Sequence, residues 1–309
     1  MMRARYPLPT DLVALVSFDG RVYPNEAKPW DRLGLDERAR PLETALEQWF
    51  SFATGKHTWV SVRGATIRGL ISARRRAKRS AWEVEVLIDA DEDRRVISSL
   101  FSQMLAGVTR QGAERVFLRL SSDSGAVKAA REAGFFPYCR QTLYRSRQKA
   151  MPEATELKLR ARARGDLFGI YQLYNQAVPA NVRAIEGATF REWQAALEPW
   201  GRRPADFLLE EEGVISGWVR LLSGGIARLQ VLGGSRNVPI EDLLSAGCLR
   251  LAGAGVILCL APEYDAGLAL TLERLAFRPA GDYVLMAKRL LKPAEELVPE
   301  TTSTAVPAN

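Results

Sequence analysis

The chain has 309 residues, of which 47% are hydrophobic and 26% charged, a composition typical of a folded protein with room for two domains of ordinary size. No apolar run approaches the roughly 18 to 20 residues that a membrane-spanning helix needs, and no signal-peptide segment follows the N-terminus, so we expect a cytoplasmic protein without membrane contact. The net charge of +7 is uneven, because residues 1–150 carry +9 and the remainder carries −2.

Apolar periodicity divides the first half into alternating strands and helices. The strongest helical pattern covers residues 93–110, where aspartates precede the first turn and can cap it. The predicted elements are a helix over 41–52, strands over 58–62, 66–73 and 82–88, the helix over 93–110, a strand over 116–120, a helix over 125–132 and a closing strand pair over 136–144.

The second half follows a polar stretch over 145–156, which reads as a linker. It opens with a strand, then a helix after Asp166 that turns Ile170 and Leu173 or Tyr174 inward. The remaining predictions are a hairpin of strands over 206–210 and 214–222, a strand over 226–232, a helix from about Val238-Pro239, a strand over 256–260, a helix to 275 and a strand over 283–287. The helix from Val238-Pro239 is expected to bury Ile240, Leu243, Leu244 and Leu251.

Two stretches about 140 residues apart read as the same unit. A short apolar strand from Val116 is followed by a helix and an Ala-Gly-Phe that ends at Phe135, and a strand from Val256 is followed by a helix and a Leu-Ala-Phe that ends at Phe277. A repeat this long indicates a duplicated domain rather than a solenoid. We therefore expect one domain over 1–148, a second over 155–291, and a disordered tail over 292–309.

The cysteines and the histidine argue against a metal site. Cys139, Cys248 and Cys259 lie far apart in apolar surroundings without a second cysteine or a histidine at ligand spacing, so we interpret them as reduced core residues. The only histidine, His57, is expected at the surface near the start of a strand.

The basic excess of the first half is concentrated in Arg74–Arg79. Such a cluster can bind nucleic acid or an anionic partner. We favour a solvated hairpin tip, because no aromatic residues are interleaved for base stacking, and nucleic acid is not the expected partner.

The order of elements, repeated twice, resembles the GNAT superfamily of acyl-CoA-dependent N-acyltransferases. The residues that carry the resemblance are Leu159-Arg160-Ala161 with Asp166, Ile170 and Leu173-Tyr174-Asn175, the paired strands at Ile67-Arg68-Gly69 and Ile215-Ser216-Gly217, and Ala133-Gly134-Phe135. The resemblance implies an α/β (α+β) fold of two tandem GNAT-like domains, each a mixed, mainly antiparallel sheet flanked by helices. Mycothiol synthase has a similar tandem arrangement.

In that family acyl-CoA lies beside the fourth strand, and amides at the start of the next helix hold its pyrophosphate. The matching stretch of the first copy, Asp89–Ile97, carries four carboxylates that would repel phosphate, so we expect no CoA there. The second copy has an acid-free loop that predicts the acetyl-CoA site or, alternatively, a plain turn capped by Asn237. The predicted cofactor-binding residues are Val231, Leu232, Gly233, Gly234, Ser235, Arg236 and Asn237.

Acyl transfer in this family needs a general acid and a general base, and the sequence offers candidates for both. The tyrosine that usually protonates the thiolate in this family is replaced by Ala130 and Leu272. Tyr264 is the candidate acid, because it starts the second copy's last helix. Glu83 and Glu85, on one face of their strand, are the candidate bases, and Gln230 is their nearest counterpart in the second copy.

These patterns favour an N-acyltransferase that uses acetyl-CoA as co-substrate, needs no metal and acts on a small-molecule or peptide amine. The alternative is a GNAT-like binding or scaffolding protein that has lost catalysis, and a third hypothesis is nucleic-acid association through Arg74–Arg79. We expect a monomer or a homodimer.

Overall fold

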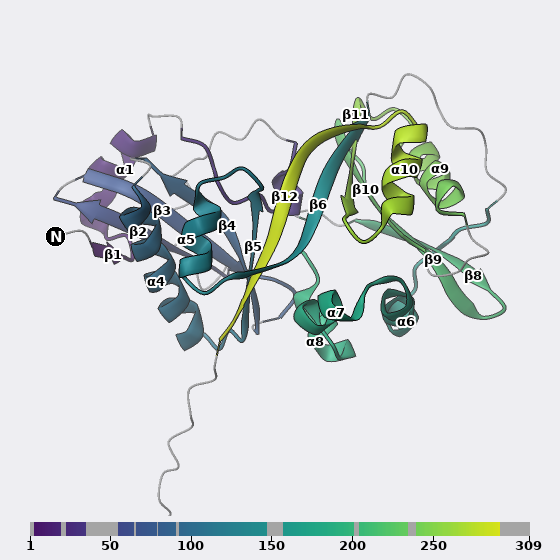
Figure 1. Cartoon of the computed structure of the whole chain (residues 1–309), viewed down its shortest axis with the longest axis horizontal. Coiled ribbons are helices and arrows are strands. Elements are labelled where there is room, and N and C mark those ends of the chain that lie inside the picture. Colours follow the sequence, from purple (N-terminus) through teal and green to yellow (C-terminus); the bar gives the residue numbers. More distant parts are fainter. Residues whose placement is uncertain are drawn as a thin grey trace, which may run out of the picture.

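The computed structural model describes residues 3–19, 23–34, 55–64, 66–78, 80–90, 93–146, 157–200, 204–233 and 239–290 (Figure 1). The predicted helix over 41–52, most of the predicted linker and the tail beyond 290 lie outside the described residues. None of the described helices is long and apolar enough to cross a membrane.

Twelve strands of the described chain form one continuous sheet in the order β1-β2-β3-β4-β5-β12-β6-β11-β10-β9-β8-β7. Neighbouring strands are antiparallel except for β4–β5 and β10–β11, which are parallel. The strands are β1 (Arg3–Arg5), β2 (Lys56–Arg63), β3 (Thr66–Arg75), β4 (Ala81–Asp89), β5 (Arg115–Ser121), β6 (Phe136–Ser146), β7 (Arg160–Ala161), β8 (Ala205–Glu211), β9 (Val214–Leu222), β10 (Ile226–Gly233), β11 (Val256–Pro262) and β12 (Arg278–Arg289).

Helices cover both faces of this sheet. In the first half the neighbouring residues Leu70 and Ile71 of β3 belong to different core clusters, one with α1 and one with α4, so these two helices lie on opposite faces. In the second half α9 and α10 cover one face and α6 to α8 the other. The helices are α1 (Leu12–Asp19), α4 (Arg94–Arg110), α5 (Ala126–Glu132), α6 (Leu167–Ala177), α7 (Ala180–Glu186), α8 (Phe190–Ala196), α9 (Ile240–Arg250) and α10 (Ala266–Arg274).

The two copies exchange their last strands. Strand β6, from the first copy, pairs with β11 of the second copy, whereas β12, from the second copy, pairs with β5 of the first. The two long strands also pair with each other and cross between the halves in Figure 1. The predicted strand pair over 136–144 is therefore wrong, because this segment is one strand whose partners lie in the other copy. The domain limits at 148 and 155 remain a prediction.

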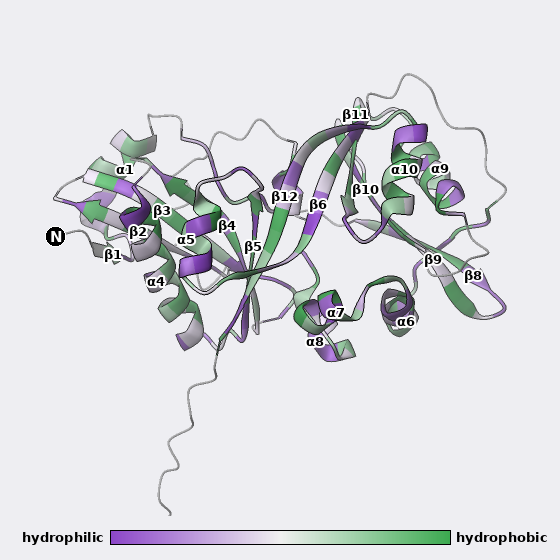
Figure 2. Cartoon of the chain, in the orientation of Figure 1, coloured by the Kyte–Doolittle hydropathy of each residue, from purple (hydrophilic) through white to green (hydrophobic). Residues whose placement is uncertain are grey.

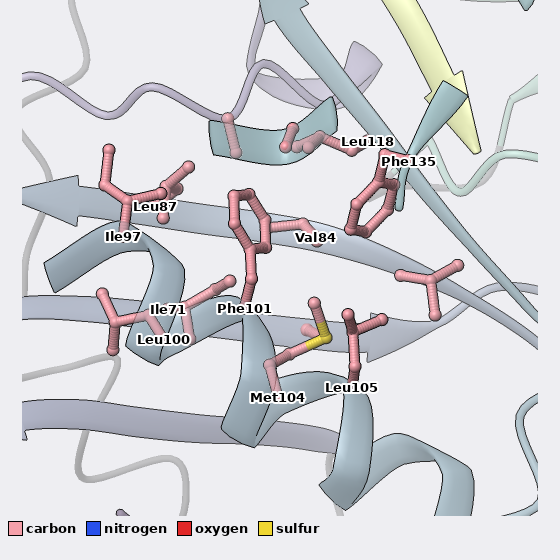
Figure 3. Packing of buried hydrophobic residues seen from close by; sticks show 14 of the residues in the cluster. Ile71, Val84, Leu87, Ile97, Leu100, Phe101, Met104, Leu105, Leu118 and Phe135 are labelled. Atoms are coloured by element: carbon pink, nitrogen blue, oxygen red, sulfur yellow. The ribbon is translucent and has the colours of Figure 1, made fainter. Parts of the chain in front are cut away.

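Both cores follow the predicted patterns. Asp93 caps α4, accepting a hydrogen bond from the backbone of Arg95 at 2.9 Å, and the apolar stripe of the helix is buried as expected. Figure 3 shows Phe101 and Met104 of α4 reaching toward Ile71 and Val84 of the sheet. Figure 2 shows hydrophobic residues along strands such as β5, mixed hydropathy along β6 and β12, and hydrophilic residues in helices such as α5.

A glycine at the same place in each copy lets a helix pack close to the sheet. A β-carbon on Gly69 would lie 2.6 Å from a methyl group of Val96 in α4, and one on Gly217 would lie 2.9 Å from a methyl group of Leu243 in α9. Both distances are shorter than van der Waals contact. The Ile-x-Gly pairs of the sequence therefore mark the two helix-on-sheet contacts.

The predictions for the cysteines are confirmed, and the one for His57 is partly wrong. All three cysteines are free and buried, and burial raises the pKa of Cys139 and of Cys248 to about 12. His57 lies near the start of β2 as predicted, but it is buried beside Tyr6, Trp59 and Trp82. Burial, with a smaller effect of nearby Arg75, lowers the pKa of His57.

The repeated turn after α5 and α10 uses a left-handed residue in both copies. Gly134 has a φ of 87°, and Ala276, at the matching position, has a φ of 63°. In each turn the following phenylalanine donates a backbone hydrogen bond to the last turn of the helix. Only glycine adopts this conformation without steric cost, so the second copy carries a strained alanine.

We predict that Ala276→Gly raises the free energy of unfolding by about 0.5 kcal/mol, because the relief of strain exceeds the added freedom of the unfolded chain. The matched change Gly134→Ala should lower it by about 1 to 2 kcal/mol. Urea unfolding monitored by circular dichroism measures both differences. A loss of stability in Ala276→Gly would contradict the assignment.

Candidate functional site

The strands β10 and β11 separate after a short parallel segment. Their pairing runs from Ile226 with Val256 to Leu229 with Cys259 and then stops, although β10 continues to pair with β9 as far as Gly233. A cavity of about 260 Å³, which we call the cleft, opens where the strands part. Its lining includes Gln230, Val231, Leu232, Gly233, Leu260, Pro262, Tyr264 and Leu268.

A second cavity of about 140 Å³, which we call the chamber, adjoins the cleft. Both are lined by Arg119, Gln141, Glu198, Gln230, Leu232 and Tyr264. The chamber lies under α6, α7 and α8. Its aromatic lining residues are Tyr138, Tyr174, Trp193, Trp200, Trp218 and Tyr264.

Glu186, the last residue of α7, carries the unpaired carboxylate of the chamber. It accepts hydrogen bonds from the hydroxyl groups of Tyr174 at 2.9 Å and Tyr138 at 3.2 Å, and it forms no ion pair within the described residues. Burial raises the pKa of Glu186, and these hydroxyl groups and the charge of Arg76 offset part of the shift. The raised pKa makes this carboxylate a stronger base than an exposed glutamate, as a general base requires.

Arg119 and Glu198 form a buried ion pair between the cleft and the chamber. The guanidinium Nη1 and Nη2 donate to the two carboxylate oxygens at 2.6 and 2.9 Å. Burial acts to raise the pKa of Glu198, but Arg119 outweighs it and lowers that pKa to about 2. Likewise, burial acts to lower the pKa of Arg119, and Glu198 raises it above the ordinary value. Glu198 is therefore ionised and committed to Arg119 and to the backbone amide of Trp30, 3.1 Å away.

Tyr264 stands where the cleft meets the chamber. It precedes α10 and packs against the core cluster beneath α6. Burial, followed by the negative charge of Glu186, raises the pKa of Tyr264, so its hydroxyl stays protonated and can donate a proton. The structure thus brings this predicted acid to the cavity, and its role remains a prediction.

The predicted cofactor loop is described only in part. Val231, Leu232 and Gly233 line the cleft as the prediction requires, whereas Gly234, Ser235, Arg236 and Asn237 lie outside the described residues. The residues at the usual tyrosine position, Ala130 and Leu272, are fully buried in the two hydrophobic cores. Neither could contact a substrate in either cavity.

Glu83 and Glu85 do not line the cleft or the chamber. Each is 2% exposed and belongs to a buried ion cluster, in which Glu83 accepts from Arg74 and Arg76 and Glu85 pairs with Arg32 and Lys56. Their arrangement is that of structural ion pairs, because cations already occupy both carboxylates.

The prediction that Arg74–Arg79 forms a solvated hairpin tip is wrong for Arg74, Arg75 and Arg76. Arg74 is buried and pairs with Asp31 through two hydrogen bonds of 2.7 and 2.8 Å. Arg75 stacks on Trp82, and Arg76 lies 4.1 Å over the ring of Phe117 while lining the chamber. Arg79 lies outside the described residues. The first three arginines of this run therefore form contacts inside the protein. That the run does not bind nucleic acid remains a prediction.

The first copy has the same divergence of parallel strands, but its own chain fills the gap. Strands β4 and β5 pair only from Ala81 to Glu83. Beyond that point the segment 25–28 lies between them, with the amide of Glu26 donating to Leu87 of β4 at 2.8 Å and the amide of Lys28 donating to Arg119 of β5 at 2.9 Å. The side chain of Asn25 donates to the carbonyl of Glu85 and accepts from the amide of Leu87.

A substrate would find no room in this filled gap. The strand ends also differ between the copies: Gly69 lies opposite Asp89 in the first copy, whereas Gly217 lies opposite Gly233 in the second. These contacts support the expectation that the first copy does not bind CoA in the family manner.

Sequence reasoning missed the residues that come from the short helices. Glu186 ends α7, Glu198 follows α8, and neither helix has a clear apolar period. One signal was present, because an arginine inside the apolar strand VFLRL requires a buried partner. That arginine is Arg119. No cluster of potential metal ligands occurs in the described residues.

Solved structures of known proteins share this architecture. A GCN5-related N-acetyltransferase from Sphaerobacter thermophilus matches with a TM-score of 0.51 and 17% identity over 93% of this chain and 95% of its own. A tandem GNAT protein from the clavulanic acid biosynthesis pathway matches with a TM-score of 0.53 and 12% identity over 94% and 98%. The chain has the tandem GNAT fold. Neither a protein-family model nor a curated protein sequence matches the chain.

We predict that Glu198→Gln lowers the free energy of unfolding by about 3 kcal/mol at pH 7, because it leaves the Arg119 charge buried without its partner. The pKa of Glu198 falls from 4.5 to about 2 on folding. Its stabilisation is therefore complete above pH 4.5 and is lost as the pH falls toward 2.

The difference in the free energy of unfolding between the native protein and Glu198→Gln, measured by urea unfolding, should become smaller as the pH falls from 4.5 toward 2. Glu211→Gln, which removes one charge from an exposed position on β8, is the control. A pH-independent difference would contradict the pairing.

Proposed function

We propose that the protein is an N-acyltransferase that binds acetyl-CoA in the cleft of its second copy and acylates an amine held in the chamber. The observation that carries the proposal is the cleft between β10 and β11, which adjoins the chamber containing the unpaired carboxylate of Glu186. The tandem GNAT fold supports the same class of reaction.

The cleft fits the pantetheine arm of acyl-CoA. From Gln230 to Gly233 the edge of β10 that faces β11 has no strand partner, so its backbone groups can bond to the amides of a bound thioester. In the first copy the chain itself bonds to the corresponding edges, through Glu26 and Lys28. Gly233 ends the strand without a side chain or a charge, which favours the approach of a pyrophosphate.

The residues around the thioester can move the two protons that acylation requires. Glu186 accepts one proton from the ammonium group, which frees the nitrogen lone pair to attack the thioester carbonyl. The new C–N bond forms, the C–S bond breaks, and the nitrogen releases a second proton. Tyr264 protonates the departing thiolate and regains a proton from the nitrogen, so the net reaction releases one proton through Glu186.

An alternative function is a binding protein with the same fold and no turnover. The filled cleft of the first copy and the core positions of Ala130 and Leu272 favour it. The two functions differ in the formation of free CoA when amines are supplied.

We predict that acetyl-CoA binds to the native protein and that Gly233→Asp weakens its binding at least tenfold, because the new carboxylate repels the pyrophosphate. The fold should tolerate the change, since a β-carbon there stays 3.4 Å from its nearest neighbour. Isothermal titration calorimetry measures both affinities.

Gly233→Asn is the matched control, because it has the same shape as aspartate without the charge, and it should bind acetyl-CoA more tightly than Gly233→Asp. No heat with the native protein at high micromolar acetyl-CoA would refute the proposed function. Equal binding by the aspartate and asparagine variants would refute the placement of the site.

A further inference from the structure

We propose that the acceptor is a small amino acid, whose ammonium group binds Glu186 and whose carboxylate binds Arg76 and Arg119. This inference rests on the proposed function and specifies its acceptor. It follows from three properties of the chamber: its volume, its unpaired donors and its balance of charge.

The volume of the chamber suits an acceptor of a few atoms. A cavity on the order of 150 Å³ holds a benzene molecule, with about six non-hydrogen atoms. The chamber measures about 140 Å³, so it accommodates a molecule of the size of alanine or serine. A peptide chain or a polyamine would have to extend into the cleft, where the thioester is expected.

Two guanidinium groups at the chamber each have one nitrogen without a hydrogen-bond partner. The side chains of Arg76 and Arg119 are only 8% and 4% exposed, and both line the chamber. Their Nη atoms are occupied, those of Arg119 by Glu198 and those of Arg76 by Glu83 and the carbonyl of Ala196. The Nε atoms of both arginines are buried and have no hydrogen-bond partner among the described residues.

An unused N–H in a buried guanidinium is costly unless a ligand accepts from it. A carboxylate has two oxygens and can accept from two such donors at once. The side-chain oxygen of Gln141, at the boundary with the cleft, is likewise buried without a partner and can accept from the amine.

Glu186 provides the negative charge of the site. Its donors are the neutral hydroxyl groups of Tyr138 and Tyr174, so its negative charge is uncompensated by an ion pair. The rings of Tyr174 and Trp193, 5.9 Å apart, form part of the adjoining wall, and aromatic faces stabilise ammonium groups.

The remaining charges of the chamber cancel in pairs. Glu198 neutralises Arg119, and Asp206 neutralises Arg220 through a hydrogen bond of 2.7 Å. Arg74 and Arg76 are matched by Asp31 and Glu83, which leaves Glu186 as the carboxylate of the chamber without an ion pair. The ammonium group of an amino acid matches Glu186 and its carboxylate accepts from the buried Nε atoms, whereas a plain amine leaves those donors unused and a plain acid leaves Glu186 unpaired.

Calorimetry with single small molecules tests this inference. Glycine, L-alanine, L-serine and L-threonine are each titrated into the full-length protein, and ethylamine and propionate serve as the counterparts of alanine that lack one charged group. We expect at least one amino acid to bind, and to bind at least tenfold more tightly than either counterpart.

Arg76→Lys keeps a cation beside Glu83 but lacks the Nε donor, and Glu186→Gln removes the negative charge. Each should weaken amino-acid binding at least tenfold and leave acetyl-CoA binding within twofold of native. Arg183→Lys, on the same helix as Glu186 but outside the chamber lining, should change neither affinity. Urea unfolding of each variant checks that the fold is intact.

The inference is overturned if no amino acid binds, if ethylamine binds as tightly as alanine when alanine is the bound ligand, or if Arg76→Lys has native amino-acid affinity. In each case acetyl-CoA binding by the native protein shows separately whether the proposed function stands. If the native protein binds an amino acid but not acetyl-CoA, the proposed transferase function is refuted and the assignment of the chamber as an amino-acid site is supported.

Discussion

The antiparallel pairing of β6 with β12 is the interaction on which the rest of the structure depends. Through it each copy completes the other's part of the sheet, so twelve strands form one continuous surface. The exchange places Tyr138 and Gln141, from the first copy, beside Gln230 and Tyr264, from the second. A site assembled in this way requires both copies, although only one of the two clefts is open.

The backbone groups at the diverging parallel strands have different surroundings in the two copies. Where parallel strands diverge, their amides and carbonyls lose their partners and must be satisfied by something else. In the first copy the segment 25–28 supplies hydrogen bonds, and the same segment continues to Trp30, which lines the cleft of the second copy. The carbonyl of Trp30 accepts from Arg228 of β10 at 3.0 Å. Closure of one cleft thus helps to shape the other.

The sequence predicted most of the fold and only part of the site. Strong apolar periods located α4 and α9, whereas the close helix packing at Gly69 and Gly217 emerged only from the structure. The strand exchange could not be predicted, because local patterns specify a strand but not which copy supplies its partner.

The site residues show the same limit. Tyr264 and the strand from Val231 to Gly233, which the order of elements indicated, line the cleft, and their roles remain predictions. Glu83 and Glu85 were assigned as bases from their shared face, yet their surroundings include Arg32, which is distant in sequence. Glu186 was missed since the seven-residue helix that positions it is stabilised by tertiary contacts rather than by a periodic stripe.

The most direct test of acetyl-CoA binding in the cleft of the second copy is hydrogen–deuterium exchange by mass spectrometry with and without saturating acetyl-CoA. We expect slower exchange in peptides covering β10 and the segment from β11 to Leu268, and no change in β4. Protection of β4 and β5 with none at β10 would contradict it.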